Sequence, residues 1–379
     1  MSTTSSAVVP LAPARGLATH GGDLDAIVAR HGGDADDYLD LSANLDPLGP
    51  PHALLEALAV AARDVASLRR YPEPTSARLR AALARRRGVP ADAIVVGNGA
   101  AALLETALAE PRVRTCVLPV PAFSEHRRAL AALGIAEVPL RLEPAEDFAL
   151  DARRTLAAVR ASGADALLLA NPHNPSGSLL AADAMRALVA EIAALGCRTI
   201  LDEAFIEYAP GGGLTADAST HASLVVIRSL TKFYAAPALR VGYAVLAPAR
   251  AAALRARLPS WPVTTLAAHA LEAALGDTAY DARALAGNRD ARIAIASELR
   301  RLGCHVVPSA ANFILAELPT SAPPATAVAA WLARERRVVV RDCSTYDGLE
   351  HGRWIRVAAR GLAERTRAVA ALRDAIAAC

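Results

Sequence analysis

The chain of 379 residues contains a single lysine, Lys232, so 40 of its 41 basic residues are arginines. Aromatic residues make up only 4% of the chain although 53% of it is hydrophobic, because alanine supplies much of the apolar share. No apolar run reaches the length that spans a membrane. The formal net charge is only +3 and the arginines are scattered, so we expect neither a membrane nor a nucleic acid as partner.

Cysteine is also scarce, and the five cysteines show no metal-ligand spacing. An odd number without a repeated spacing argues against a disulfide framework and against a metal site. We therefore predict reduced, buried thiols and a cytoplasmic protein. Residues 1–18 lack a basic start and an unbroken apolar block, so we predict a disordered tail rather than a signal peptide.

Short apolar runs alternate with helical patterns between residues 94 and 246, which predicts an α/β fold with a seven-stranded, mostly parallel sheet. We expect a large domain over 46–262 and a smaller α+β domain over 263–379. We expect the N-terminal segment 19–45 to be part of the smaller domain. In the smaller domain, Val338–Arg341 is one of three predicted strands. The seven runs of the large domain are Ile94–Val96, Cys116–Val120, Ala136–Leu142, Ala166–Ala170, Thr199–Leu201, Leu224–Ile227 and Val241–Leu246.

The lone lysine has two explanations. An arginine-biased genome leaves one lysine by chance, or this position requires an amine. A lysine with a lowered pKa forms an imine with a carbonyl, whereas arginine stays protonated and cannot. Lys232 follows a predicted strand, and ligands of such sheets bind beyond the carboxyl ends of the strands.

The residues around Lys232 favour the second explanation. Ser229, Thr231 and Arg240 offer hydroxyl and guanidinium groups that bind phosphate well. Asp202 ends another predicted strand, and a carboxylate there keeps a pyridine nitrogen protonated, which makes the ring an electron sink.

Two further loops follow predicted strands. The first contains Asn174 between two prolines, which predicts a turn whose amide could donate to a cofactor oxygen. The second, around Gly99 and Ala100, opens a predicted helix whose backbone N–H groups could bind phosphate.

Together, these motifs resemble the pyridoxal-phosphate-dependent aminotransferase superfamily of fold type I over nearly the whole chain. Within it, the chain is most similar to the threonine-phosphate decarboxylases of cobalamin biosynthesis, which are related to histidinol-phosphate aminotransferases. The matching segments are His20-Gly21-Gly22-Asp23, residues 41–49, Arg70-Tyr71-Pro72, residues 202–206 and residues 228–243.

The resemblance implies pyridoxal 5'-phosphate as the cofactor, a phosphorylated amino acid as the substrate and a homodimer with shared active sites. Lys232 and Asp202 would be the catalytic residues, and Asn174 would contact both cofactor and substrate. The other implied cofactor residues are Gly99, Ala100, Phe123, Ser229, Thr231, Arg240 and Tyr71, the last reaching the neighbouring subunit. The implied substrate residues are His20, Gly22, Asn44, Arg341 and Arg356, and no metal is implied.

The sequence departs from the family at Phe205, where many members have a tyrosine, and at Ala100, where a polar side chain is common. The resemblance implies decarboxylation of L-threonine O-3-phosphate. Transamination of histidinol phosphate or a similar substrate stays open, as does decarboxylation of another phospho-amino acid. A pyridoxal-phosphate-binding regulator is the non-enzymatic alternative, although the segment before His20 is short for a DNA-binding unit.

Overall fold

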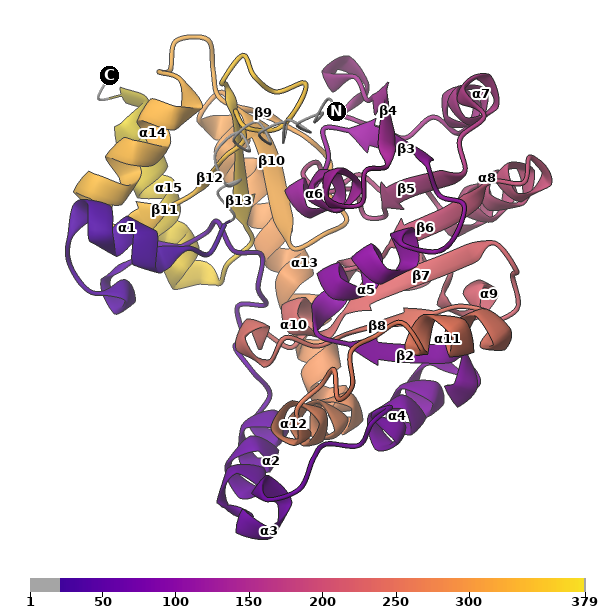
Figure 1. The fold of residues 1–379 in the computed structure, drawn as a ribbon. Helices are drawn as coiled ribbons and strands as arrows, with labels where there is room; N and C mark the ends of the chain where they lie inside the picture. Colours follow the sequence, from indigo (N-terminus) through magenta and orange to yellow (C-terminus); the bar gives the residue numbers. More distant parts are fainter. Residues whose placement is uncertain (1–20, 378–379) are drawn as a thin grey trace, which may run out of the picture.

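A computed structural model describes residues 21–377, so the predictions for residues 1–18 and for His20 lie outside the described residues. The chain forms two layered parts, a large one around a seven-stranded sheet and a smaller one that carries both described ends (Figure 1). This α/β architecture with a mostly parallel sheet confirms the predicted fold class, and each of the seven apolar runs forms a strand.

The large sheet has the strand order β2-β8-β7-β6-β5-β3-β4. Strand β8 is antiparallel to both of its neighbours, and the other pairs are parallel. The strands are β2 (Ile94–Gly97), β3 (Thr115–Val120), β4 (Ala136–Arg141), β5 (Ala166–Ala170), β6 (Arg198–Asp202), β7 (Leu224–Ser229) and β8 (Gly242–Val245).

Helices cover both faces of this sheet, which explains why its inner strands are largely apolar without alternation. On β7, Val225 packs into one core and the next residue, Val226, packs into the other. The Val225 side is covered by α5 (Gly99–Leu108), α6 (Ser124–Ala132) and α11 (Pro248–Arg255). The Val226 side is covered by α2 (His52–Arg63), α4 (Ala77–Arg87), α7 (Ala152–Ser162), α8 (Ala182–Ala194) and α12 (Thr265–Gly276).

Local capping residues fix several of these helix ends. Asp151 accepts a hydrogen bond from the backbone N–H of Arg154 and begins α7, which ends at Gly163 in a left-handed conformation. Thr264 caps α12 in the same way as Asp151 caps α7. The short helices α3 (Val65–Leu68), α9 (Thr215–Ala218) and α10 (Leu230–Phe233) complete the large part.

The smaller part contains a four-stranded antiparallel sheet and a two-stranded parallel one. The predicted strand Val338–Arg341 is split between them, because Val338–Val339 pairs with β1 whereas Arg341 pairs with β13. The elements are α1 (Leu24–His31), β1 (Leu39–Asp40), β9 (His305–Val306), β10 (Phe313–Glu317), α14 (Ala325–Trp331), β11 (Val338–Val339), β12 (Arg341–Asp342), β13 (Trp354–Ala358) and α15 (Leu362–Ala377).

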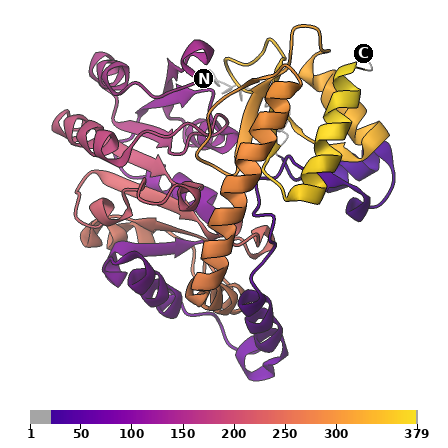
Figure 2. The same cartoon turned by 180° about the vertical axis from the view of Figure 1, so that it is seen from behind.

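The long helix α13 (Thr278–Arg301) connects the two parts (Figure 2). Tyr280 near its start lies in the core of the large part, whereas Leu299 near its end lies in the core of the smaller part. The predicted boundary at residue 263 assigns α12 to the smaller domain, yet buried residues of α12 pack into the large core. We therefore place the change of core within α13.

The described residues contain no helix that is both long and apolar enough to cross a membrane. Within the same range, no group of three or more histidine, cysteine, aspartate or glutamate side chains is arranged to hold a metal ion. The four described cysteines, Cys116, Cys197, Cys304 and Cys343, are buried and unbridged.

Candidate active site

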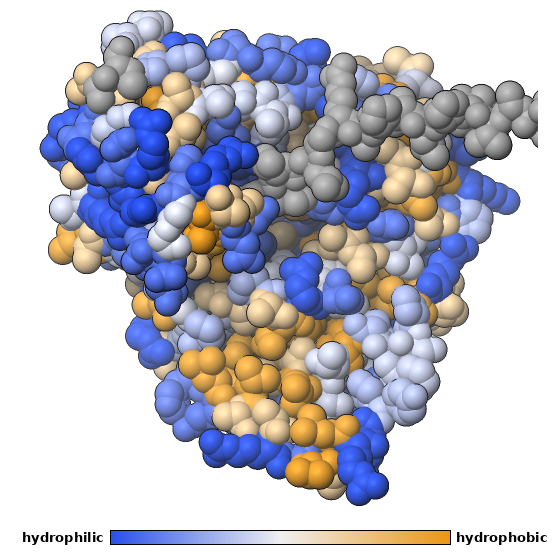
Figure 3. Space-filling view, turned by 60° about the vertical axis from the view of Figure 1, so that its left-hand side comes forward, coloured by the Kyte–Doolittle hydropathy of each residue, from blue (hydrophilic) through white to orange (hydrophobic). Residues whose placement is uncertain are grey.

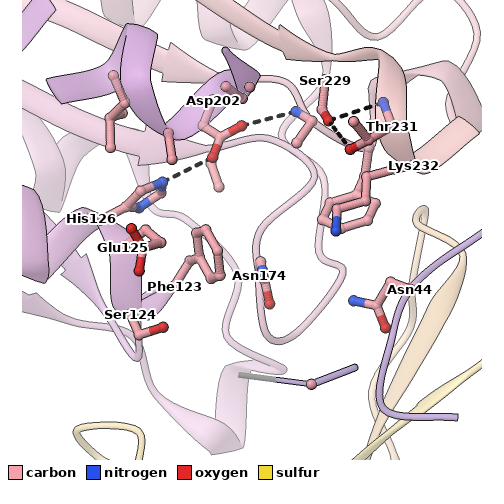
Figure 4. A pocket seen from close by; sticks show the side chains of 18 of the residues that line it. Asn44, Phe123, Ser124, Glu125, His126, Asn174, Asp202, Ser229, Thr231 and Lys232 are labelled. Carbon is pink, nitrogen blue, oxygen red and sulfur yellow. Dashed lines mark hydrogen bonds and ion pairs between the residues drawn. The ribbon is translucent and has the colours of Figure 1, made fainter. Parts of the chain in front are cut away.

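A cavity of about 430 Å³ lies at the carboxyl ends of the central parallel strands, a volume typical of small-molecule sites. Strand β6 ends at Asp202, β7 ends at Ser229, and the loop after β5 carries Asn174. Figure 4 shows Phe123, Asn174, Asn44 and Lys232 around this space, with Asp202 and His126 beside it. The predicted site residues that line the cavity are Asn44, Gly99, Ala100, Phe123, Asn174, Asp202, Ser229, Thr231, Lys232, Arg240, Arg341 and Arg356.

Two predicted site residues do not line this cavity. Tyr71 is 78% exposed, and its ring stacks on that of Trp261 with 4.3 Å between the centroids. Gly22 donates its backbone N–H to Ser42 Oγ at 2.9 Å, and its neighbour Gly21 lines the cavity instead. Within one chain, the fold therefore leaves Tyr71 at the surface.

The Lys232 amine reaches the cavity from the short helix α10, directly after β7. Its pKa is lowered to about 8, first by burial and then by the positive charges of Arg356 and Arg240, while Asp202 acts in the opposite direction. A lysine in this environment carries a far larger fraction of neutral amine near pH 7 than an exposed lysine. The neutral amine is the form that attacks a carbonyl.

Asp202 is held by two hydrogen bonds. Its Oδ1 accepts the backbone N–H of Ala204 at 2.9 Å, and its Oδ2 lies 2.9 Å from His126 Nε2. His126 is buried on α6, three residues after Phe123, and the two rings meet edge to face with 5.7 Å between centroids. These two hydrogen bonds fix the position of the Asp202 carboxylate, which lines the cavity.

A cradle for an anion forms where α5 begins. In the sheet register, Gly97 and Ser229 both pair with Gly242, which brings the start of α5 beside the end of β7. A Cβ on Gly242 would lie 2.5 Å from the backbone nitrogen of Ala100, so only glycine permits this approach. Ser229 Oγ lies 2.8 Å from Thr231 Oγ1 at the same place.

Arg240 completes the cradle from the other side. A Cβ on Gly99 would lie 2.9 Å from a terminal nitrogen of Arg240, and Gly99 has a φ of +81°. Glycine therefore lets the guanidinium group approach the first turn of α5, where backbone N–H groups attract anions. The helix start, the two hydroxyls and the guanidinium converge on one position.

The opposite wall comes from the smaller part of the molecule. Arg356 donates to Asn174 Oδ1 at 2.6 Å, which leaves the Asn174 amide N–H groups for a ligand. Arg341 donates to Thr345 Oγ1 at 2.9 Å. The buried Asn44 Oδ1 and Arg356 Nε have no hydrogen-bond partner among the described residues. Buried polar atoms without partners are costly, so their presence here favours a polar ligand.

Sequence reasoning missed several residues that line this cavity, among them His126 and Tyr346. A single histidine on a helix is ordinarily part of the core, and only its spacing of three residues from Phe123 hinted at a common side. Tyr346 lies in a loop between β12 and β13 and lines the cavity. No periodicity marks a loop residue, so the sequence held no comparable signal for it.

Similarity to known proteins extends over most of the chain. The family model described as aminotransferase class I and II matches residues 36–372. The threonine-phosphate decarboxylase of Salmonella typhimurium is 33% identical over 363 residues, which covers 94% of this chain and 96% of that protein. Histidinol-phosphate aminotransferase 1 of Cupriavidus pinatubonensis is 31% identical over 363 residues, covering 94% and 93%.

Solved structures show the same fold. The histidinol-phosphate aminotransferase of Sinorhizobium meliloti in complex with pyridoxal-5'-phosphate has a TM-score of 0.86 at 25% identity, covering 98% of this chain and 99% of that one. The L-threonine-O-3-phosphate decarboxylase of Porphyromonas gingivalis has a TM-score of 0.76 at 24% identity, covering 88% and 97%.

The cavity offers the groups that pyridoxal phosphate requires. Lys232 supplies an amine of lowered pKa, Asp202 a carboxylate for the ring nitrogen and Phe123 an aromatic surface. The cradle at the start of α5 matches the phosphate group in charge and in donor type. The residues present therefore fit the cofactor of this family.

Proposed function

Because the chain belongs to the class I and II aminotransferase family of pyridoxal-phosphate enzymes, we propose that it decarboxylates L-threonine O-3-phosphate to (R)-1-aminopropan-2-yl phosphate and CO2. One observation carries this proposal: two buried arginines, Arg341 and Arg356, line the same cavity as Lys232. A cavity with two guanidinium groups beside the amine suits an amino acid that carries both a carboxylate and a phosphate.

In this proposal each residue of the cavity has a separate role. Bound pyridoxal phosphate supplies an electron sink that weakens the bonds of the substrate α-carbon. Lys232 binds the cofactor and moves protons near the α-carbon, while Asp202 keeps the ring nitrogen protonated. Phe123 packs on the ring and Asn174 donates to the ring oxygen. The groups of the cradle are Ser229, Thr231, Arg240 and the backbone at Gly99 and Ala100.

Substrate orientation selects the reaction. Only an α-carbon bond perpendicular to the cofactor ring is weakened, so the bond that breaks depends on where the two anions are held. With the phosphate held by one arginine, the carboxylate would be oriented for loss as CO2, and Lys232 would be placed to return a proton to the α-carbon. We propose that Arg341 and Arg356 hold the two anions and that Asn44, Gly22 and His20 contribute to the same substrate site.

Transamination is the second candidate. The 31% identity to a histidinol-phosphate aminotransferase favours it. Lys232 and Asp202 would serve transamination as well as decarboxylation. An amino-group acceptor such as 2-oxoglutarate carries two carboxylates and would also suit two arginines. The two reactions therefore require the same residues and differ in how the anions are placed.

Products separate these candidates. The purified, pyridoxal-phosphate-loaded protein is incubated with L-threonine O-3-phosphate, with and without 2-oxoglutarate, and CO2 and glutamate are measured. CO2 release without the keto acid supports decarboxylation, and glutamate formation supports transamination. L-Threonine without phosphate and the Lys232→Ala protein are the controls. Absence of both products would sink the proposed reaction and favour a regulator.

We also propose a homodimer in which Tyr71 contributes to the site of the second copy. Tyr71 and Trp261 lie on the same part of the surface as α2 and α3, where Val60 and Val65 are 70% and 66% exposed. Figure 3 shows apolar side chains gathered on this part of the molecule. A Tyr71→Phe protein should be dimeric by sedimentation but should bind the cofactor more weakly.

A further inference from the structure

Two positive side chains of the cavity wall are direct cross-strand neighbours. In the antiparallel pair β12–β13, Arg341 lies opposite Arg356. Residues in this relation project from the same face with Cβ atoms roughly 5 Å apart, and like charges there repel. Arg341 and Arg356 are only 7% and 5% exposed, so water screens the repulsion poorly.

Tyr346 contacts both guanidinium groups. Arg356 donates to the Tyr346 hydroxyl at 3.4 Å, and Arg341 Cζ lies 5.4 Å from the centroid of the Tyr346 ring. The ring face attracts a cation through its quadrupole, while the hydroxyl oxygen accepts a hydrogen bond. One side chain therefore uses different atoms to stabilise each of the two charges.

The Tyr346 side chain is held firmly in this position. It is 6% exposed and packs in a small core with Phe148, Leu349 and Trp354. The Tyr346 backbone N–H donates to the Cys343 carbonyl, and the Tyr346 carbonyl accepts from Leu349, both at 3.0 Å. The loop between the two strands therefore fixes where the ring lies relative to the arginines.

Arg356 has only neutral hydrogen-bond partners among the described residues. Besides Tyr346, it donates to Asn174 Oδ1 and to the Ser42 carbonyl at 3.1 Å, and its Nε is buried without a partner. No carboxylate lies within ion-pair distance of Arg356 in the described part of the chain. Its positive charge is therefore available to an anion that enters the cavity.

We propose that Tyr346 is a positioning residue that holds the Arg341 and Arg356 guanidinium groups apart and thereby sets the spacing of the two anionic groups in the substrate. This inference deepens the proposed function and rests on it for the identity of that substrate. It also makes a chemical distinction, since the hydroxyl serves Arg356 and the ring serves Arg341.

Two substitutions separate these contacts in the cofactor-loaded enzyme. Tyr346→Phe keeps the ring and removes the hydroxyl, so KM for L-threonine O-3-phosphate should rise about three- to tenfold with kcat within about twofold. Tyr346→Leu removes both contacts and should raise KM about 30- to 100-fold. Calorimetry with inorganic phosphate should show weaker binding in the same order.

Tyr38 provides a matched control outside the cavity. Arg337 lies over its ring at 5.0 Å from Cζ to the centroid and donates to its hydroxyl, so the chemistry of the pair is the same. Tyr38→Phe should leave KM and phosphate affinity unchanged. A purely structural role for Tyr346 would instead lower the unfolding temperature and kcat without changing phosphate affinity, which would overturn the inference.

The test also separates the two proposals. Tyr346 variants with the affinities of the unsubstituted protein would overturn the positioning role and leave the proposed reaction intact. If the unsubstituted enzyme releases no CO2, the proposed reaction fails, and phosphate calorimetry on the same variants still decides the role of Tyr346. Phosphate binding that is weaker in Tyr346→Phe and weaker still in Tyr346→Leu would support the positioning role.

Discussion

The pKa of Lys232 can be tested directly because Lys232 is the only lysine of the chain. Burial and the charges of Arg356 and Arg240 lower this pKa from 10.5 to about 8. At pH 7.5, a pKa of about 8 leaves about 24% of the amine neutral, compared with about 0.1% at the ordinary value. The neutral fraction that an amine-directed acylating reagent attacks is therefore roughly 200-fold larger for Lys232 than for a lysine of ordinary pKa.

The assay uses the protein freed of cofactor. Acylation rates are measured from pH 6 to 11 on the Lys232 peptide by mass spectrometry, which separates this amine from the chain terminus. The rate should rise with a midpoint near pH 8. Arg356→Gln removes a charge that lowers the pKa and should move the midpoint up, whereas Asp202→Asn should move it down. Arg63→Gln, an exposed substitution on α2, is the control and should change nothing.

The two opposite shifts make the reasoning refutable. A midpoint above pH 10 would show that Lys232 lies in a solvated environment and has no special reactivity at neutral pH. A midpoint near pH 8 that stays the same in both Arg356→Gln and Asp202→Asn would show that burial alone sets the pKa. In that case the electrostatic argument for the site would be wrong although the amine would remain reactive.

Three further predictions follow from named contacts. Lys232→Ala should lose the visible absorbance of bound cofactor and all turnover while keeping its circular dichroism spectrum; normal activity would refute its role. His126→Phe removes the partner of Asp202 Oδ2 and should weaken cofactor binding about tenfold in an absorbance titration, and equal affinity would contradict the role of the pair. Burial raises the pKa of Asp46 from 3.8 to about 6, so the folded protein favours the protonated carboxyl group. The contribution of this group to the free energy of unfolding is complete below about pH 4 and is lost as the pH rises through about 6. Asp46→Asn, which can keep the contact with Tyr208, should therefore unfold in urea with about 2–3 kcal/mol more free energy at pH 7.5 and with an equal value at pH 4.

The sequence alone determined those features that short segments encode. Apolar runs buried on both faces, such as Leu224–Ile227, mark parallel strands wherever they lie, because burial on both sides leaves no place for polar side chains. Asp202 and Ser229 each end such a run, so their common location at the edge of the sheet followed from the order of elements. The lone lysine and the motifs around it likewise identified the cofactor family.

Tertiary structure alone decided the contacts that join distant segments. His126 contacts Asp202 because α6 packs against the sheet near the carboxyl end of β6. Tyr346 contacts two arginines because β12 and β13 pair in a register that places Arg341 opposite Arg356. The packing of α12 in the large core depends on α2, more than 200 residues earlier, and no local pattern reports it. Such contacts depend on strand order and register, which are settled by packing of the whole chain rather than by any single segment.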